Sequence, residues 1–271
     1  MSDPNHLDIE NDFLGYIPEL PEVAGKFIAL TRQLNTVNKL YANLLLSDAL
    51  LSTRLFSYIN LTLCQGDMSY MSLNKGLSLV GLHEAKNIVL VFSLFPLFEE
   101  ANCIDLFKYS LTSAFYSKKI ALEYNLINPQ DAFLLGFLHD IGRIVMKNKF
   151  KDKYLLPAFP YSDFRDEDSF EKEIQKFGCN HADLSEFILK KWRLPLIICD
   201  SVKYHHSPLK AMLPQAASIL YLSDILCKKN TRLSKNDLEI FDYMHFTKSG
   251  FGAFIPECDR QTLPYFNVLN I

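Results

Sequence analysis

A histidine and an aspartate stand side by side in a largely apolar stretch of this chain. The pair is His139-Asp140, and the stretch runs from Phe133 to Met146. Burying two titratable groups costs free energy unless each finds a hydrogen-bonding or charged partner. The pair must therefore be either a functional site or a buried structural clasp, and in both cases other polar side chains have to reach it. Further polar candidates follow in the second half of the chain: His181, His205, His206 and Asp224.

Helix start signals recur along the chain. Asn128 followed by Pro129 is typical of a helix cap and first turn, and this helix is predicted to run through His139 and Asp140. Further helical segments are predicted to begin at Pro195, Pro214 and Ser234. Alternating strand patterns bounded by turn dipeptides do not occur in the sequence. The sequence therefore predicts an all-α protein.

Composition and charge narrow the class of protein. With 271 residues and 49% hydrophobic content, the chain can bury a sizeable core. A net charge of -3 argues against general binding to nucleic acid, which needs a concentrated basic face. The longest apolar run, Ile88 to Phe98, is about half of what a bilayer span needs. We therefore expect a cytoplasmic protein with no membrane or nucleic-acid partner, whose 6 scattered cysteines are reduced.

Four short motifs in the second half resemble one known family. They are Leu134–Arg143 (LLGFLHDIGR), Gly178–Leu184 (GCNHADL), Trp192–Pro195 (WRLP) and His205–Pro208 (HHSP). Together with Leu20-Pro21-Glu22-Val23 and the run from Leu46 to Leu55, these motifs resemble the HDOD domain of bacterial signalling proteins. The resemblance implies a helical, HD-like architecture with an N-terminal helical subdomain.

The resemblance also implies a domain organisation. It covers residues 14–210, with an N-terminal helical half at 14–100 and an HD-like half at 103–210. Residues 211–271 would form a C-terminal helical extension and tail, with Asp224 packing on the HD-like half. Within this tail, the stretch from Gly250 to Pro256 is predicted to be irregular and rich in aromatic residues.

A metal site is implied by the same resemblance. HDOD domains are relatives of the HD phosphohydrolases, whose metal site uses a His, an adjacent His-Asp pair and a later Asp. His139, Asp140 and Asp224 match the pair and the last Asp, whereas the nearest residue to the first His is Tyr109. The related HD-GYP phosphodiesterases add histidines, which makes His181, His205 and His206 additional pocket candidates. A bound iron, manganese or zinc ion would activate water for phosphoester hydrolysis.

Two departures from this pattern weaken the hydrolase interpretation. No histidine lies between His83 and His139, and the phenol of Tyr109, with a usual pKa of about 10, is a poor ligand at neutral pH. The Gly-Tyr-Pro signature of the HD-GYP enzymes is missing after His206, where the chain reads Ser207-Pro208-Leu209-Lys210. Three alternatives stay open: a polar clasp, a degenerate metal site without activity, and an active hydrolase. We expect the clasp, and assign neither a catalytic residue nor a resident cofactor.

The histidines outside the pair have ordinary explanations as well. His205 and His206 would lie at a helix C-terminus, where the helix dipole favours a cation. His181 follows Asn180, a residue typical of helix caps, and could simply face solvent.

Two functions of different classes follow from these observations. The resemblance implies a non-catalytic regulatory module that acts by binding a protein of bacterial signalling or motility. The alternative is a metal-dependent phosphohydrolase of the HD superfamily, so enzymatic activity stays undecided at the level of sequence.

Overall fold

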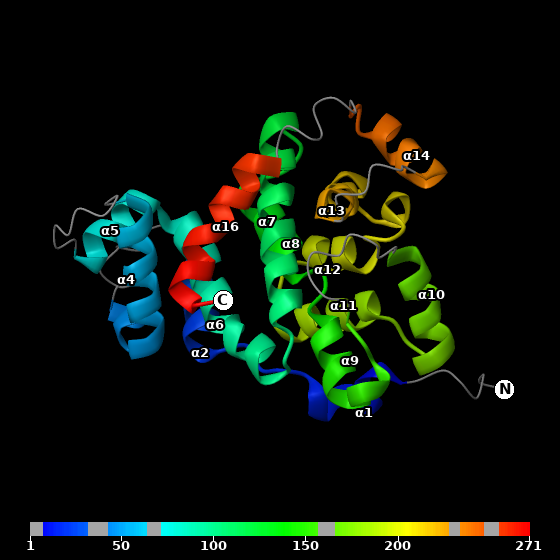
Figure 1. The fold of residues 1–271 in the computed structure, drawn as a ribbon, viewed down its shortest axis with the longest axis horizontal. Coiled ribbons are helices and arrows are strands. Elements are labelled where there is room, and N and C mark those ends of the chain that lie inside the picture. Colours follow the sequence, from blue (N-terminus) through cyan, green and yellow to red (C-terminus); the bar gives the residue numbers. More distant parts are fainter. Residues whose placement is uncertain (1–7, 32–42, 64–71, 157–165, 228–233, 247–254) are drawn as a thin grey trace. The chain divides into compact units, whose positions relative to one another are not determined.

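The computed structural model of the chain describes residues 8–31, 43–63, 72–156, 166–227, 234–246 and 255–271. In these ranges every regular element is a helix and no β-strand occurs, which confirms the predicted all-α class. The α-helices, labelled in Figure 1 where there is room, are α1 (Ile9–Phe13), α2 (Glu22–Thr31), α4 (Ala49–Leu63), α5 (Leu73–Val80), α6 (Leu82–Glu100), α7 (Ile104–Tyr124), α8 (Pro129–Leu138), α9 (Gly142–Phe150), α10 (Asp166–Phe177), α11 (His181–Lys191), α12 (Leu196–Lys203), α13 (Pro214–Cys227), α14 (Lys235–Tyr243) and α16 (Ile255–Leu269). None of them is long and apolar enough to cross a bilayer.

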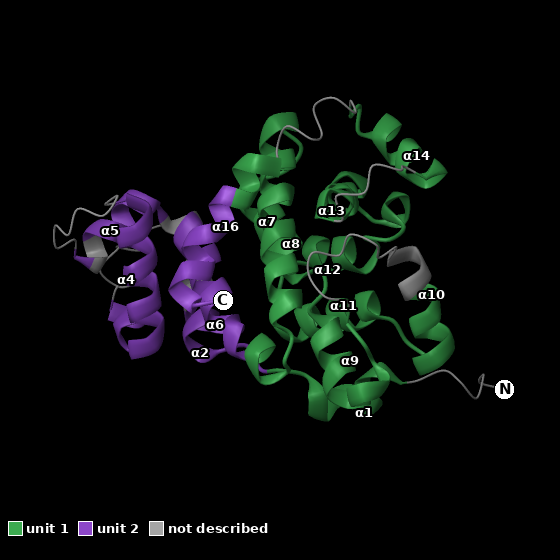
Figure 2. Cartoon of the chain, in the orientation of Figure 1, with its two compact units in different colours: residues 1–18, 97–259 green, residues 19–96, 260–271 purple. Residues whose placement is uncertain are grey.

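The chain divides into two compact units, which Figure 2 draws in different colours. The first unit consists of Met1–Pro18 and Leu97–Asp259, and the second of Glu19–Pro96 and Arg260–Ile271. Every candidate site residue named from the sequence belongs to the first unit.

An aromatic cluster forms part of the core of the second unit. Its members are Tyr58 of α4, Phe92 of α6 and Tyr265 of α16. The ring centroid of Tyr265 lies 4.5 Å from that of Tyr58 and 5.5 Å from that of Phe92. Aromatic pairs at such distances stabilise a fold beyond the area that they bury. The end of the chain therefore contributes to the core of the unit that begins at residue 19.

Helix α7 is the element on which the first unit is assembled, and α8 and α13 pack against it. Gly136 lets α8 approach closely, because a Cβ at this position would lie 2.6 Å from the Cα of Ala114 on α7. On α13, the Ser223 hydroxyl lies 2.9 Å from the Ser113 hydroxyl of α7, at hydrogen-bonding distance. Both helices are thereby held against the same helix.

Helix α8 begins as predicted but ends earlier. The Asn128 side chain accepts a hydrogen bond from the first turn, and Pro129 occupies the first helical position. The helix ends at Leu138, so His139 and Asp140 lie in a tight turn that leads into α9. The expectation that both residues lie inside a helix was wrong.

The turn follows from a close approach at Gly142. Its backbone N–H donates to the Ser185 hydroxyl of α11 at 2.8 Å. A Cβ at this position would lie 2.2 Å from the carbonyl oxygen of His181, so only glycine fits without movement. Because α9 packs directly on the beginning of α11, the chain has to change direction at the His-Asp pair.

Most of the stretch from Gly250 to Pro256, predicted to be irregular, lies outside the described residues. Its described end, Ile255 and Pro256, opens α16. Proline is tolerated there because the first backbone N–H groups of a helix have no partner within the helix. The buried positions of α16 follow helical spacing and are Cys258, Thr262, Tyr265 and Leu269.

Candidate functional site

The His-Asp pair is almost completely buried in the first unit. His139 is 1% exposed and Asp140 is 2% exposed. The Nδ1 atom of His139 lies 2.8 Å from the carbonyl oxygen of Gly136. Because a carbonyl oxygen only accepts hydrogen bonds, Nδ1 carries a proton, and Nε2 is the ring atom left for other partners.

Tyr109 of α7 and Asp224 of α13 both reach the pair. The Tyr109 hydroxyl donates a hydrogen bond to Oδ1 of Asp224. The same carboxylate oxygen lies 3.5 Å from Nε2 of His139, and Oδ2 of Asp140 lies 3.7 Å from that nitrogen. The structure therefore brings Tyr109 and Asp224, both named from the sequence, to the His139-Asp140 pair. Tyr109 is the residue nearest in sequence to the first histidine of the HD pattern, and here its phenol is hydrogen-bonded to the Asp224 carboxylate.

Arg143 is a member of the site that sequence reasoning missed. It is buried, and its Nε donates to Oδ2 of Asp140 at 2.9 Å. Its Nη1 donates to Oε1 of Glu173 and to the Tyr154 hydroxyl, both at 3.1 Å. One guanidinium thus bridges two buried carboxylates. The three-residue spacing from Asp140 could have identified Arg143, whereas no spacing connects it to Glu173 on the distant helix α10.

His181 is fully buried at the start of α11, so the solvent-facing alternative was wrong. Its Nδ1 lies 2.6 Å from Oε2 of Glu173, and its backbone N–H donates to the same oxygen at 2.8 Å. Burial alone would raise the pKa of Glu173, but His181 and Arg143 hold it at about 2. Glu173 is therefore an anion at neutral pH.

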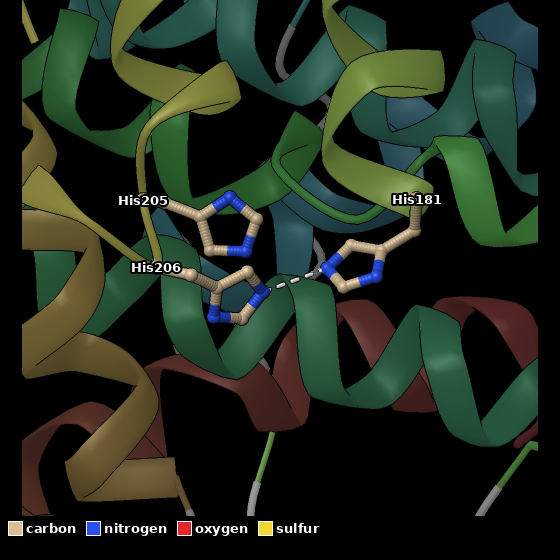
Figure 3. Close-up of side chains that lie close together, drawn as sticks. All are labelled: His181, His205 and His206. Atoms are coloured by element: carbon tan, nitrogen blue, oxygen red, sulfur yellow. Dashed lines mark hydrogen bonds between the residues drawn. The ribbon is translucent and has the colours of Figure 1, made fainter. Parts of the chain in front are cut away.

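Three imidazoles form a cluster beside the pair: His181, His205 and His206 (Figure 3). His205 lies in the turn after α12, close to the predicted helix end, and its Nδ1 is 2.6 Å from the carbonyl oxygen of Val202. The Nε2 atoms of His181 and His206 lie 2.8 Å apart and share a hydrogen bond. His205 is buried, while His206 is half-buried.

The charges of the buried site largely compensate one another. Burial alone would lower the pKa of His139, but the charges of Asp140 and Asp224 raise it to about 9, so this imidazole is protonated at neutral pH. Burial, together with the charge of His139, lowers the pKa of His205 to about 4, so His205 is neutral. The carboxyl groups of Asp140, Asp224 and Glu173 are buried together with the Arg143 guanidinium and the His139 imidazole that face them.

Three buried atoms of the site have no hydrogen-bond partner among the described residues: Nε2 of His139, Oδ1 of Asp140 and Nε2 of His205. The same three side chains each place one ligand atom within 4.8 Å of the others. Imidazole nitrogen and carboxylate oxygen are suitable donors for zinc, manganese and iron, so the donor set fits a divalent transition metal. Within the described part of the chain, the other set that meets this distance condition is the histidine cluster of His181, His205 and His206. Neither set includes Asp224.

Comparison with known families decides which family this arrangement represents. The sequence matches the HDOD domain over residues 17–208. The chain belongs to the HDOD family. This confirms the family that the sequence motifs indicated. Among curated proteins, no relative matched this HDOD protein.

Solved structures share the HDOD fold over nearly the whole chain. A candidate phosphohydrolase from Shewanella amazonensis is 15% identical, with a TM-score of 0.72, and the match covers 98% of this chain and 99% of that one. An HDOD domain protein with unknown function from Geobacter sulfurreducens is 19% identical, with a TM-score of 0.70 and 94% of both chains covered. A candidate signal transduction protein from Marinobacter aquaeolei is 17% identical, with a TM-score of 0.74, and the match covers 96% of this chain and 60% of that one. At these identities the likeness shows the fold alone.

Proposed function

We propose that this HDOD protein is a non-catalytic bacterial signalling module that acts by binding a protein partner. The hydrogen bond from Tyr109 to Asp224 carries the proposal. In the HD pattern a histidine and this aspartate would both be ligands, whereas here a phenol takes the histidine's place and engages the carboxylate. Arg143 engages the second carboxylate, that of Asp140. Protein contacts therefore occupy groups that a hydrolytic centre would use for its metal.

The kind of partner is inferred from the family and from the charge of the chain. The HDOD domain is found in bacterial signalling proteins. One structural neighbour is named as a candidate signal transduction protein. A module without chemistry of its own passes its signal on by contact, so we propose a signalling or motility protein as partner, bound by the module at residues 14–210. Because the net charge is only -3, this binding should depend on shape and apolar contact more than on charge.

Capture followed by reconstitution tests the proposal. The tagged full chain is used as bait in an extract of its own cells, with a tag-only bait as control, and the captured protein is then purified and titrated against the chain by calorimetry. We expect one signalling or motility protein to be retained at moderate salt and to bind the purified chain with a defined stoichiometry. Recovery of nucleic acid alone, or of nothing under several growth conditions, would contradict the proposal.

A metal-dependent phosphohydrolase is the second candidate. It is favoured by the buried donor atoms without hydrogen-bond partners on His139, Asp140 and His205, the residues that would hold the ion. A bound ion would lower the pKa of a coordinated water to about 7 and polarise a phosphoryl oxygen. If this second function is correct, the metal-loaded chain hydrolyses a phosphodiester and the Asp140→Ala variant does not.

A further inference from the structure

We propose that the start of α12 and the loop before α13 form a docking surface for a partner protein that presents an apolar segment flanked by carboxylates. This surface, which we call the α12 surface, consists of Leu196, Ile197 and Met212. The inference rests on the proposed signalling function and deepens it, because it names the part of the chain that the partner contacts and the chemistry that the partner presents.

The three side chains of the α12 surface are large, apolar and exposed to solvent. Leu196 is 57% exposed, Ile197 is 40% exposed and Met212 is 60% exposed. Pro195, which directly precedes α12, is exposed as well, whereas Ile198 on the same helix is buried. A single exposed apolar side chain is ordinary in a folded protein, but a contiguous group of them marks an interaction site.

A buried carboxylate brings these three side chains together. Asp200 of α12 is 8% exposed, and its Oδ2 accepts a hydrogen bond from the backbone N–H of Met212 at 2.6 Å. Leu196 and Ile197 precede Asp200 by four and three residues, so both are its neighbours on the helix surface. Because the backbone of Met212 is held at the same carboxylate, its side chain is exposed within one helical turn of the other two. The three exposures therefore form one patch.

The charge around the α12 surface is positive. The sequence from 187 to 223 contains one acidic residue, Asp200, which is buried. Arg193 lies just before α12, Lys210 lies two residues before Met212, and both cations are exposed. The first turn of α12 carries no acidic residue, so no side chain of that turn offsets the positive end of the helix dipole. This setting favours a partner with carboxylates beside its apolar residues, because complementary charges at the edge of an interface fix its specificity.

Lys210 differs in its ion pairing from other lysines of this region. Lys190 and Lys203 each form an ion pair with Glu186, at 2.7 Å and 3.0 Å. Within the described part of the chain, no ion pair involves Lys210. Its ammonium group is therefore available to a carboxylate of the partner, and Lys210 is the position at which the charge of the surface is tested.

The composition of the surface favours a protein over a lipid bilayer or a nucleic acid. Recognition of anionic lipids typically uses clusters of about 4–8 basic residues, and binding to nucleic acid needs a basic face. The α12 surface instead has an apolar centre with only a few cations beside it. The flexible thioether side chain of Met212 adapts readily to an apolar partner.

A displayed library of random peptides tests the surface without any component of the cell. The library is sorted on the full chain, and each enriched peptide is titrated against two double variants. Leu196→Gln with Met212→Gln alters the α12 surface. Leu122→Gln with Leu155→Gln is the control, because these leucines are 59% and 79% exposed in other elements of the same unit. All four positions are exposed, so each double variant should melt within about 4 °C of the parent, which verifies that it is folded.

We expect enriched peptides in which Asp or Glu stands beside apolar residues. The variant of the α12 surface should bind them about tenfold or more weakly than the parent, because two apolar contacts are lost, and the control should bind like the parent. Lys210→Gln should weaken binding by about two- to fivefold, with a smaller effect at high salt. Enriched peptides without acidic residues, equal binding to both double variants, or no enriched peptide at all would overturn the proposal. So would a dimer of the full chain, or binding to anionic vesicles, that Leu196→Gln with Met212→Gln abolishes.

The partner captured from the extract separates a failure of this inference from a failure of the proposed function. If that partner binds the parent and the variant of the α12 surface equally, the signalling function stands and the α12 surface is wrong. If the extract yields no partner, the signalling function fails, and the peptide library still decides whether the surface binds acidic, apolar segments.

Discussion

At the scale of single residues, Arg143 supplies the positive charge beside the buried Asp140 carboxylate. The guanidinium lies 2.9 Å from Oδ2 of Asp140 and also reaches Glu173. Removing one member of a buried ion pair leaves the other charge uncompensated, which typically costs about 3–5 kcal/mol. The polar cluster is therefore coupled to the stability of the first unit whether or not it binds a ligand.

Asp140→Ala tests this coupling directly. We expect the variant to melt roughly 6–12 °C below the parent in calorimetry, from a loss of about 3 kcal/mol at 2–4 °C per kcal/mol. A strong chelator in the buffer removes any contribution of metal. Asp152→Ala, which removes an exposed carboxylate from the same unit, is the control and should melt like the parent. An Asp140→Ala variant that also melts like the parent would show that the pair is not a structural clasp.

Glu173 gives the site a defined response to acid. Its pKa is lowered from 4.5 to about 2, so the charged form stabilises the fold above pH 4.5 and the contribution is lost as the pH falls through 2. The free energy of unfolding of the parent should therefore exceed that of Glu173→Gln at pH 5 to 7. The difference should shrink toward pH 2, measured by urea unfolding at each pH. A difference independent of pH would mean that shape, and not charge, makes Glu173 stabilising.

At the scale of elements, Gly142 sets the direction of the chain at the site. An added Cβ would meet backbone atoms of α11, which cannot move aside as a flexible side chain could. Overpacking of this kind costs about 1–3 kcal/mol or more, so Gly142→Ala should melt several degrees lower than the parent. Gly15→Ala is the matched control, because nothing lies within 4 Å of its added Cβ. Equal melting of both variants would refute the close packing of α9 on α11.

The start of α8 could be predicted from the sequence, but its end could not. Local signals such as Asn128-Pro129 predicted where α8 begins, because caps and first-turn prolines act within a few residues. The end of α8 was missed because it depends on the contact of Gly142 with α11, which no local pattern contains. In the same way, the family resemblance indicated His139, Asp140 and Asp224, whereas Glu173 reaches the site from a helix with no sequence signal that links it to them.

At the scale of the whole molecule, the end of the chain is part of the second unit. Tyr265 is fully buried against Tyr58 and Phe92. Removal of a buried aromatic side chain typically costs about 3–5 kcal/mol. Deletion of residues 260–271 should therefore increase amide hydrogen exchange in α4 far more than deletion of residues 270–271 alone. Unchanged exchange in α4 after the longer deletion would contradict this account of the second unit.

As a signalling module of the proposed kind, this HDOD chain should carry its His-Asp pair without a working hydrolytic centre. The most direct measurement is the rate of hydrolysis of a cyclic dinucleotide and of a chromogenic phosphodiester by the full chain. The chain is supplied in turn with Mn²⁺, Fe²⁺ and Zn²⁺, and Asp140→Ala is assayed beside it. We predict that both proteins give the rate of the metal-containing buffer alone, because Tyr109 holds Asp224 and Arg143 holds Asp140. A parent rate well above this background that Asp140→Ala abolishes would contradict the account.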